Sequence, residues 1–260
     1  MPVFQIINFT PETIADYGVC GYKDVKKHKE LRNKIEWYRK YYPEGLRIKA
    51  VLAEDGSYQG MLEYIPGELA HRPVNTAGYM FIHCLFVGFK KQYKGQGFAS
   101  ALLEECIHDA KAQNKAGVAV VTRKGSFMAK RDIFLKFGFT VVDSAKPDFE
   151  LLVLKFVYSA TEASFRHEVL DDLSNYQKGL TIMRSVQCPY TEKNVKAILA
   201  TAKTKYNLKT NLFDINDAES AQQTPCAFGT FCMIYEGKVI SHHPISNTRF
   251  QNIMGKILGK

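Results

Sequence analysis

A glycine-rich segment between an apolar strand and a helix is the part of the sequence best suited to binding an anion. The apolar run ends at Val87, Gly95 and Gly97 follow, and helical periodicity begins at about Phe98. Glycines let the backbone approach a ligand closely, and the first N–H groups of a helix, with its dipole, attract negative charge. Three lysines add positive potential: Lys90, Lys91 and Lys94. The spacing predicts a phosphate-binding site, best suited to a pyrophosphate.

Two familiar phosphate-binding motifs do not fit this segment. The pattern G-x-x-x-x-G-K-[ST] does not occur, and a dinucleotide-binding fingerprint needs three glycines and an acidic residue after the next strand. What remains is V-x4-Q-x2-G-x-G, at Val87, Gln92, Gly95 and Gly97. This pattern resembles the acetyl-CoA motif of the GNAT N-acetyltransferase superfamily. The resemblance covers roughly residues 3–157 and includes the strand order and a helix ending in Gly-Phe, in the segment FLKFGF.

The resemblance implies a reaction and a set of contacts with acetyl-CoA as co-substrate. An acceptor amine attacks the thioester directly, so the enzyme must bring the two reactants together, accept a proton from the amine and protonate the thiolate. Backbone groups at the splayed end of the strand would bind the pantetheine arm and the acetyl carbonyl, at Leu85, Phe86 and Val87. The pyrophosphate would be held by the loop and helix start, at Gln92, Tyr93, Lys94, Gly95, Gln96, Gly97, Phe98 and Ala99.

The groups that would move protons are less well defined. Many family members carry a tyrosine as general acid four residues before the Gly-Phe, but that position here is Phe134, so Tyr93, Tyr79 or a water molecule would replace it. Glu63 and His83 are the candidate bases, because both lie on strands beside the expected cleft and histidine has a suitable pKa. Each could equally be a hydrogen-bonded residue of the sheet.

The absence of a tyrosine at Phe134 also motivates an alternative function of another class. In that alternative the glycine-rich segment holds CoA in a binding or sensing module that has no acetyl-transfer turnover. The main hypothesis is an acetyl-CoA-dependent N-acetyltransferase acting on an unidentified amine. Turnover with any amine would separate the two.

A second segment with potential chemistry begins at Cys188, where a strand is followed by Cys-Pro-Tyr-Thr and a helix. A helix N-terminus lowers the pKa of a thiol, so Cys188 is a possible reactive thiol. The turn resembles the active-site turn of thioredoxins and glutaredoxins, with Thr191 in place of the second cysteine, and Thr224 and Pro225 stand where that family has its cis-proline. Without the second cysteine, a dithiol cycle cannot run inside the motif. The combination resembles the YoaP-type C-terminal domain of some bacterial GNAT proteins.

The other cysteines and histidines of this region do not form a recognisable metal site. Cys226 and Cys232 lie around a predicted strand and are expected to contribute to the core. His242 and His243 are adjacent, and adjacent residues on a strand point to opposite faces. Zinc and iron–sulfur spacings do not occur in the chain, so we expect no metal.

The elements that must position these residues follow an α/β pattern. In the first part, strands are predicted at 4–9, 46–53, 58–65, 80–87, 117–122, 140–142 and 149–157, and helices at 24–42, 98–113 and 127–137. In the second part, strands are predicted at 180–186, 208–215, 228–235 and 238–242, and helices at 192–205 and 247–258. The predicted domains are a GNAT-like mixed sheet flanked by helices (1–157), a helical connector (158–177) and a smaller thioredoxin-like βαβ-ββα domain (178–260).

The composition limits the class of protein, the partners and the location that can be expected. The chain has 260 residues, 46% hydrophobic and 23% charged, with a formal net charge of +9. The basic excess is spread along the chain and no nucleic-acid-binding motif occurs, so we expect a phosphorylated small molecule and no nucleic acid. No apolar stretch is long enough to span a bilayer, no signal peptide is visible, and the six cysteines lack paired spacing. We therefore expect a cytoplasmic protein with reduced thiols and no membrane partner.

Overall fold

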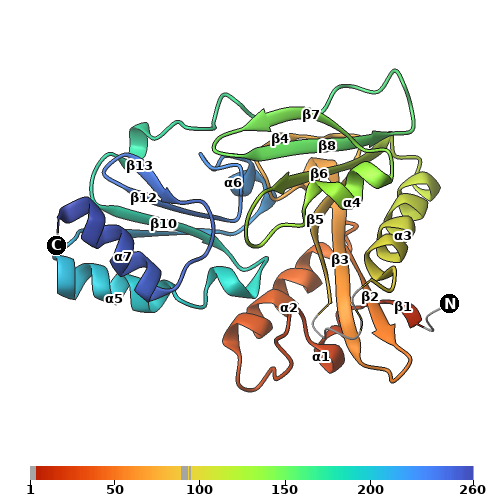
Figure 1. Ribbon diagram of the computed structural model, residues 1–260, viewed down its shortest axis with the longest axis horizontal. Helices are drawn as coiled ribbons and strands as arrows, with labels where there is room; N and C mark the ends of the chain where they lie inside the picture. Colours follow the sequence, from red (N-terminus) through yellow and green to blue (C-terminus); the bar gives the residue numbers. More distant parts are fainter. Residues whose placement is uncertain (1–3, 89–92, 94, 260) are drawn as a thin grey trace. The chain divides into compact units, whose positions relative to one another are not determined.

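The chain forms two compact units in the computed structural model (Figure 1). The structure describes residues 4–88, 93 and 95–259. The first unit comprises Met1–Ala70 and Val74–Phe165, and the second comprises His71–Pro73 and Arg166–Lys260. A short piece of the N-terminal half therefore belongs to the C-terminal unit.

The first unit contains a seven-stranded mixed sheet in the order β1-β2-β3-β5-β6-β8-β7. Neighbouring strands are antiparallel except β5 and β6, which are parallel. The strands are β1 (Phe4–Asn8), β2 (Arg47–Ala53), β3 (Tyr58–Pro66), β5 (Met80–Val87), β6 (Gly117–Arg123), β7 (Thr140–Ala145) and β8 (Phe149–Lys155). The other elements are α1 (Ile14–Tyr17), α2 (Lys29–Tyr41), α3 (Phe98–Ala112), α4 (Arg131–Lys136), the 3-10 turn η1 (Gly67–Leu69) and the paired strands β4 (Val74–Asn75) and β9 (Ser164–Phe165). The predicted mixed α/β architecture is confirmed.

Alternation of side chains along the central strands gives the sheet two different faces. Leu62, Ile82 and Val120 belong to a large apolar core that also includes the buried side of α3. Glu63 and His83 each follow one of these residues and therefore lie on the opposite face. That second face carries the polar groups considered below.

Helix α2 has a buried stripe at the spacing of one helical face. Leu31, Ile35 and Tyr38 recur every three or four residues and are buried, as their periodicity predicts. Lys34 lies on the same stripe and is only 1% exposed, although lysines are usually solvated. The Tyr38 hydroxyl donates a hydrogen bond to the carbonyl oxygen of Phe9 over 2.7 Å, which ties the helix to the chain just after β1.

The hairpin between β2 and β3 forms at the turn that the sequence predicts. Gly56 has φ +73°, in the left-handed region that favours glycine. The backbone N–H of Ser57 donates to Oδ1 of Asp55 over 3.0 Å, which closes the turn locally. The other carboxylate oxygen of Asp55, Oδ2, makes a contact outside the turn, with the hydroxyl of Tyr93.

The second unit contains a four-stranded sheet in the order β11-β10-β12-β13, with β10 parallel to β11 and the other pairs antiparallel. Its strands are β10 (Leu180–Ser185), β11 (Thr210–Ile215), β12 (Phe231–Tyr235) and β13 (Lys238–Ser241). Its helices are α5 (Val195–Tyr206), α6 (Ala218–Gln222) and α7 (Asn247–Leu258), with 3-10 turns η3 (Ser174–Tyr176) and η4 (Pro189–Thr191). Helices α5 and α7 lie side by side (Figure 1). This is the predicted βαβ-ββα order with one short helix, α6, added.

The segment His71–Pro73 is integrated into the second unit by specific contacts. The buried Arg72 guanidinium lies 5.5 Å from the centroid of the Phe228 ring and 3.4 Å from the hydroxyl of Thr230. The backbone N–H of Arg166 donates to the carbonyl oxygen of Pro73 over 2.9 Å. A Cβ added to Gly229 would lie 2.7 Å from Arg72 Cα, so the two backbones are in close contact.

Two predicted helices differ from the structure. The segment 158–177 was expected to be helical, but it contains β9, η3 and turns. Asp172 accepts a hydrogen bond from the backbone N–H of Ser174 over 3.1 Å, and such local side-chain bonds compete with helix formation. The helix predicted at 127–137 begins only at Arg131, because Phe127 has φ +70°, which a helix cannot contain.

The conformation of the peptide bond before Pro225 also differs from the expected one. The structure has its cis peptide bond at Lys146–Pro147, and the bond between Thr224 and Pro225 is trans. The resemblance to the thioredoxin family at this position therefore does not extend to the backbone conformation.

Candidate active site

The parallel strands of the first unit separate at the end of β5 that leads into the glycine-rich segment. Their pairing ends at Ile82↔Val120, although β5 continues to Val87 and β6 to Arg123. On its other side, β5 stays paired with β3 as far as Val87. One edge of β5 thus leaves the ladder with β6 after Ile82. The predicted contact residues on this part of β5 are Leu85, Phe86 and Val87.

The two glycines that precede α3 have the conformation and the space that an anion site requires. Gly95 has φ +76° and Gly97 has φ +81°. A Cβ on either glycine would meet no atom of the described residues within 4 Å, so among these residues the space beside this backbone is open. The N–H of Ala101 donates to the carbonyl of Gly97 over 3.0 Å, which starts the helix at Phe98. The helix dipole therefore adds positive potential beside the open space.

Several residues predicted for this site cannot be placed. Gln92 and Lys94, both predicted to contact the pyrophosphate, lie outside the described residues, as do Lys90 and Lys91. Tyr93, Gly95, Gln96, Gly97, Phe98 and Ala99 are described, and they lead directly into the first turn of α3.

Tyr93 is held by the hairpin between β2 and β3. Its hydroxyl donates a hydrogen bond to Oδ2 of Asp55 over 3.1 Å, and its ring centroid lies 6.2 Å from that of Phe98. The phenol proton is thus engaged by a carboxylate. The sequence does not identify Asp55 as the partner of Tyr93. The turn that contains Asp55 predicts a hairpin but gives no indication of this contact.

Glu63 and His83, the two candidate bases, are brought together. Nδ1 of His83 lies 3.2 Å from Oε1 of Glu63, and Lys34 forms an ion pair with Oε2 of the same carboxylate. All three side chains are at most 1% exposed. The Lys34 ammonium also lies 4.1 Å from the centroid of the Trp37 ring. The first unit therefore contains a buried Lys–Glu–His cluster on the face of the sheet opposite α3.

The charges of this cluster determine what Glu63 can do. Burial acts to raise the pKa of Glu63, but the charge of Lys34 and the hydrogen bond with His83 outweigh it and lower the pKa to about 2. A buried carboxylate with such a low pKa is a poor proton acceptor, but it can orient an imidazole and stabilise its charged form. His83 directly follows Ile82, the last residue of β5 paired with β6. It is therefore the residue of this cluster that lies where the strands separate.

Lys34 is the member of the cluster that sequence reasoning missed. The signal was present, because Lys34 lies three residues after Leu31 and four before Tyr38, on the stripe that the helix buries. A lysine at such a position needs a buried anionic partner. Glu63, on the predicted strand 58–65, is a carboxylate that could serve as this partner.

Phe134, at the family's general-acid position, and Tyr79, one of its candidate replacements, have other roles in the structure. Phe134 is fully buried in the apolar core, with its ring centroid 5.5 Å from that of Phe139. Tyr79 precedes the start of β5, at the end opposite Val87, and its hydroxyl donates to the carbonyl of Thr161 over 2.7 Å. Burial raises the pKa of Tyr79. Tyr79 therefore lies away from the strand end that leads into the glycine-rich segment, and Phe134 has no proton to donate.

Cys188 lies before a turn rather than at the start of the expected helix. Residues 189–191 form η4, and α5 begins only at Val195. The Thr191 hydroxyl donates to the carbonyl oxygens of Ser185 and Cys188, so the residue in the second cysteine position closes the turn. The helix N-terminus expected to activate Cys188 is therefore a three-residue turn, and the reactivity of this thiol stays a prediction.

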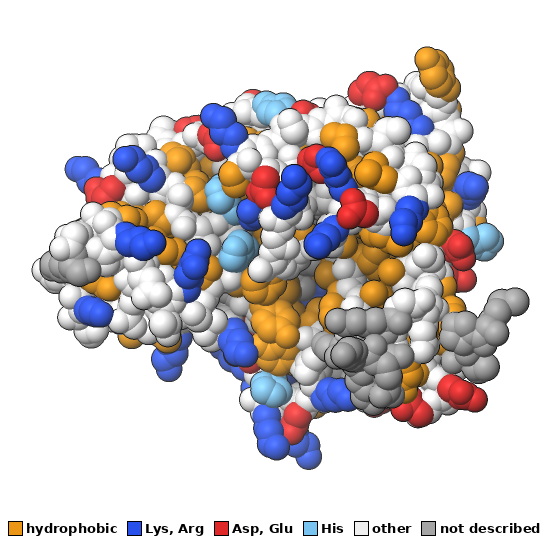
Figure 2. Space-filling model, in the orientation of Figure 1, with side chains coloured by type: hydrophobic (Ala, Val, Ile, Leu, Met, Phe, Trp, Pro, Cys, Tyr) orange, Lys and Arg blue, Asp and Glu red, His pale blue; other side chains and the backbone are white. Residues whose placement is uncertain are grey.

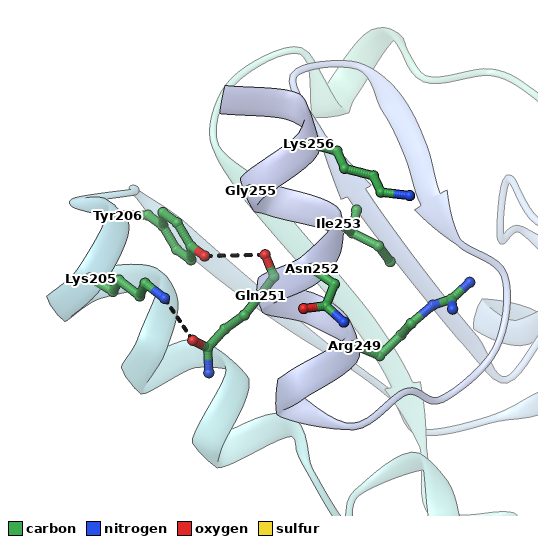
Figure 3. A pocket seen from close by; sticks show the side chains of 8 residues that line it. All are labelled: Lys205, Tyr206, Arg249, Gln251, Asn252, Ile253, Gly255 and Lys256. Atoms are coloured by element: carbon green, nitrogen blue, oxygen red, sulfur yellow. Dashed lines mark hydrogen bonds between the residues drawn. The ribbon is translucent and has the colours of Figure 1, made fainter. Parts of the chain in front are cut away.

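A cavity of about 640 Å³ lies in the second unit, along α5 and α7 (Figure 3). Gln251 joins the two helices, since its side chain accepts a hydrogen bond from Lys205 over 2.8 Å and its carbonyl accepts one from Tyr206 over 3.2 Å. Arg249 and Lys256 also line the cavity. The side chains of the lining are cationic, amide, phenolic or aliphatic, and none is a carboxylate, histidine or cysteine. None of the residues considered for acetyl transfer lines this cavity.

Figure 2 shows Lys and Arg side chains interspersed with Asp and Glu over the face that is drawn. Within the described ranges there is no group of three or more His, Cys, Asp or Glu side chains placed to hold a metal ion. Nor does any described helix combine the length and apolar character needed to cross a bilayer. All six cysteines are described, and none is in a disulfide.

Comparison with protein families defines the class to which this geometry belongs. Residues 12–139 match the acetyltransferase (GNAT) family, and residues 210–252 match the YoaP-like family. The first unit is therefore a GNAT acetyltransferase domain, and the protein is an acyltransferase that also carries a YoaP-like region. The resemblance found in the sequence is confirmed for both regions.

The chain is also similar to individual known proteins. The chain is 28% identical over 254 residues to the uncharacterized N-acetyltransferase YoaP of Bacillus subtilis strain 168, covering 96% of this chain and 98% of that protein. Among solved structures, the GNAT N-acetyltransferase YhbS of Escherichia coli in complex with CoA is 13% identical, with a TM-score of 0.40, covering 64% of this chain and 91% of that one. The PaiA N-acetyltransferase of Thermoplasma acidophilum in complex with coenzyme A is 16% identical, with a TM-score of 0.41, covering 59% and 99% respectively.

Proposed function

We propose that this acetyltransferase transfers the acetyl group of acetyl-CoA to an amine by direct attack of the amine on the thioester. The observation that carries the proposal is the end of the β5–β6 ladder at Ile82, on the strand that leads into the glycine-rich segment. A strand edge released from its neighbour can pair with the amides of a pantetheine arm. An open, positively polarised backbone beyond that edge can accept a diphosphate.

The proposed contacts with acetyl-CoA follow the chain from strand to helix. Backbone groups of Leu85–Val87 bind the pantetheine arm and polarise the acetyl carbonyl. The backbone from Gln92 to Ala99 holds the diphosphate, and Gly95 and Gly97 are supported in this role by the open space beside them. Binding acetyl-CoA along this line places the thioester near the point where β5 and β6 separate. Positioning raises the rate mainly by holding the two reactants together in this way.

His83 is the proposed base. The neutral amine attacks the carbonyl carbon, and the proton that it loses moves to the imidazole, whose Nδ1 is held by Glu63. Because the side chain of His83 is buried, the proton reaches it through a water molecule rather than by direct contact with the amine. Lys34 keeps Glu63 ionised, so the carboxylate stabilises the imidazolium that forms.

Collapse of the tetrahedral intermediate breaks the C–S bond and releases the CoA thiolate. A thiol has an ordinary pKa of about 8.5, so its thiolate is a good leaving group that a water molecule can protonate after departure. We assign Tyr93 to anchoring the loop through Asp55 rather than to acid catalysis, because its hydroxyl proton is donated to that carboxylate.

The test is a binding measurement followed by a turnover screen on the full-length protein. Calorimetry with CoA and acetyl-CoA comes first, and absence of binding at millimolar concentration would overturn the proposal. A panel of amines that includes polyamines, aminoglycosides and lysine peptides is then incubated with acetyl-CoA. Products are detected by mass spectrometry, because the six cysteines would interfere with a thiol reagent. Binding without acetylation of any amine would instead favour a CoA-binding module.

A further inference from the structure

The second unit contains a cluster of two cysteines and a histidine that the proposed acetyl transfer does not use. Sγ of Cys226 lies 3.0 Å from Nδ1 of His242. Cys232 lies close enough to Cys226 to lower the pKa of the Cys226 thiol. Cys226 is 1% exposed and Cys232 is fully buried, whereas His242 is half-buried and connects the pair to the solvent.

The fold brings these three residues together from separate elements. Ser241 at the end of β13 pairs with Met233 of β12, so His242 continues beside Cys232, the preceding residue of β12. Cys226 reaches the same place through a turn, which is closed by a 2.8 Å hydrogen bond from the N–H of Gly229 to the carbonyl of Cys226. The cluster is therefore built by strand pairing and a turn.

The electrostatics of the cluster distinguish the two sulfurs. Burial acts to raise the pKa of Cys226, but hydrogen bonds with Cys232 and His242 and the charge of His242 outweigh it and lower the pKa to about 5. The hydrogen bond with Cys226 raises the pKa of Cys232 well above its ordinary value, and burial and the charge of Asp171 act in the same direction. The two sulfurs therefore differ, and Cys226 is the one that ionises more readily.

We propose that Cys226 and Cys232 form a peroxide-sensitive dithiol that is oxidised to an intramolecular disulfide. The thiolate of Cys226 attacks one oxygen of a hydroperoxide, the O–O bond breaks, and the alkoxide or hydroxide that leaves takes up a proton, giving a sulfenic acid. The sulfur of Cys232 then attacks the sulfenic sulfur. The S–S bond forms, the S–O bond breaks, and the released hydroxide leaves as water with the proton of Cys232.

Burial restricts which oxidant can act. A molecule as small as hydrogen peroxide can reach a sulfur beside the half-buried His242, whereas glutathione disulfide or an alkylating reagent is too large for a sulfur that is 1% exposed. Cys20, Cys84 and Cys188 are more exposed than Cys226, so bulky reagents should react with these three thiols first. The cluster is therefore distinguished from these thiols by the size of the reagent.

The test is peptide mapping of the full-length protein after treatment with one to a few equivalents of hydrogen peroxide. Remaining thiols are alkylated in denaturant, and the protein is digested without reductant. Cys226 and Cys232 fall in the same tryptic peptide, residues 210–238. The expected product is this peptide without alkylation and two hydrogens lighter, while the other four cysteines are alkylated. Peroxide-treated protein in which Cys226 and Cys232 are both alkylated while Cys188 is oxidised would overturn the proposal.

Three variants separate the roles within the cluster. His242→Gln should slow formation of the disulfide at least about tenfold at pH 7, because Cys226 loses the hydrogen-bond partner that lowers its pKa. His243→Gln is the matched control and should leave the rate within twofold, since Nδ1 of His243 lies 2.9 Å from the carbonyl oxygen of Pro244 instead. Cys232→Ser should stop the reaction at a sulfenic acid on Cys226, trapped by dimedone. Equal rates for His242→Gln and His243→Gln, in variants whose circular dichroism is unchanged, would contradict the mechanism.

Discussion

Lys34 of α2 and Glu63 of β3 form an ion pair in which neither side chain is more than 1% exposed. Such a pair gains little net stability from its attraction, because both charges lose their hydration, but removal of one partner leaves the other charge buried alone. Glu63 has a second partner in His83, so the carboxylate links the helix to the strand edge where the proposed reaction takes place. Structure and proposed catalysis therefore depend on the same carboxylate.

The first prediction concerns the stability of this pair. Lys34→Met should lower the free energy of unfolding by roughly 3–5 kcal/mol, because it leaves the Glu63 carboxylate without its cation. The double variant Lys34→Met, Glu63→Leu should recover a large part of that loss. Urea denaturation of the three proteins measures both effects. The exposed pair of Glu36 and Arg39 is the control, and Arg39→Met should change stability by less than about 1 kcal/mol.

The second prediction is the pH dependence that the same carboxylate produces. The folded state lowers the pKa of Glu63 to about 2 from an ordinary value of 4.5. Its contribution is therefore complete above about pH 4.5 and is lost as the pH falls toward 2. Between pH 6 and pH 3 the stability difference between the natural protein and Glu63→Gln should shrink by roughly 2 kcal/mol. A difference that stays constant over this range would show that Glu63 is not held ionised.

A third prediction tests the open backbone before α3. Gly97→Ala should weaken CoA binding at least about tenfold, because the added methyl group would occupy the space proposed for the diphosphate. Gly78→Ala is a matched control, since Gly78 also has a positive φ, of +84°, and an added Cβ there would likewise meet no described atom within 4 Å. Each substitution should cost about 1–2 kcal/mol of stability from backbone strain. Similar CoA affinities for the two variants would place the diphosphate elsewhere.

The fourth prediction assigns the base. His83→Gln should lower kcat by about 10²–10⁴-fold with the amine that the screen identifies, because general-base catalysis contributes on that order. The affinity for CoA should change little. The acidic limb of the pH–rate profile should also disappear, which loss of a merely structural histidine would not cause. A variant that retains this limb would exclude His83 as the base.

The fifth prediction separates anchoring from acid catalysis at Tyr93. Tyr93→Phe should leave kcat within about threefold while raising the KM for acetyl-CoA, because the loop loses its hydrogen bond to Asp55. Asp55→Asn removes the charged acceptor of the same hydrogen bond and should have the same effect. If Tyr93→Phe lowers kcat a hundredfold while Asp55→Asn does not, the phenol is the general acid.

Much of the architecture could be predicted because local patterns and tertiary packing agree. The bounds of β5 and α7 are as predicted from apolar runs and helical periodicity. The predictions failed where a single backbone angle or a local hydrogen bond decides the outcome, as at Phe127 and Asp172. Such details depend on contacts that a one-dimensional pattern does not contain.

The site was predictable to a different degree in each part. The glycines before α3 carry a conformational requirement that is visible in their type and spacing, and both have the positive φ expected. Glu63 and His83 could be named as candidates, but their mutual contact depends on strand register. The partner of Cys226 could not be predicted, because His242 arrives through the pairing of β12 with β13.

The membership of His71–Pro73 in the second unit has a consequence for synthesis of the chain. These residues leave the ribosome well before β10–β13, the strands of the sheet whose unit they join. The second unit therefore completes its contacts with a segment that is synthesised before the rest of that unit. A gene fragment encoding only residues 166–260 would lack Arg72, which lies against Phe228 and Thr230. Complete folding of the second unit is therefore expected to require residues from both halves of the chain. A gene fusion that exchanges either half between relatives would have to carry His71–Pro73 with the C-terminal part.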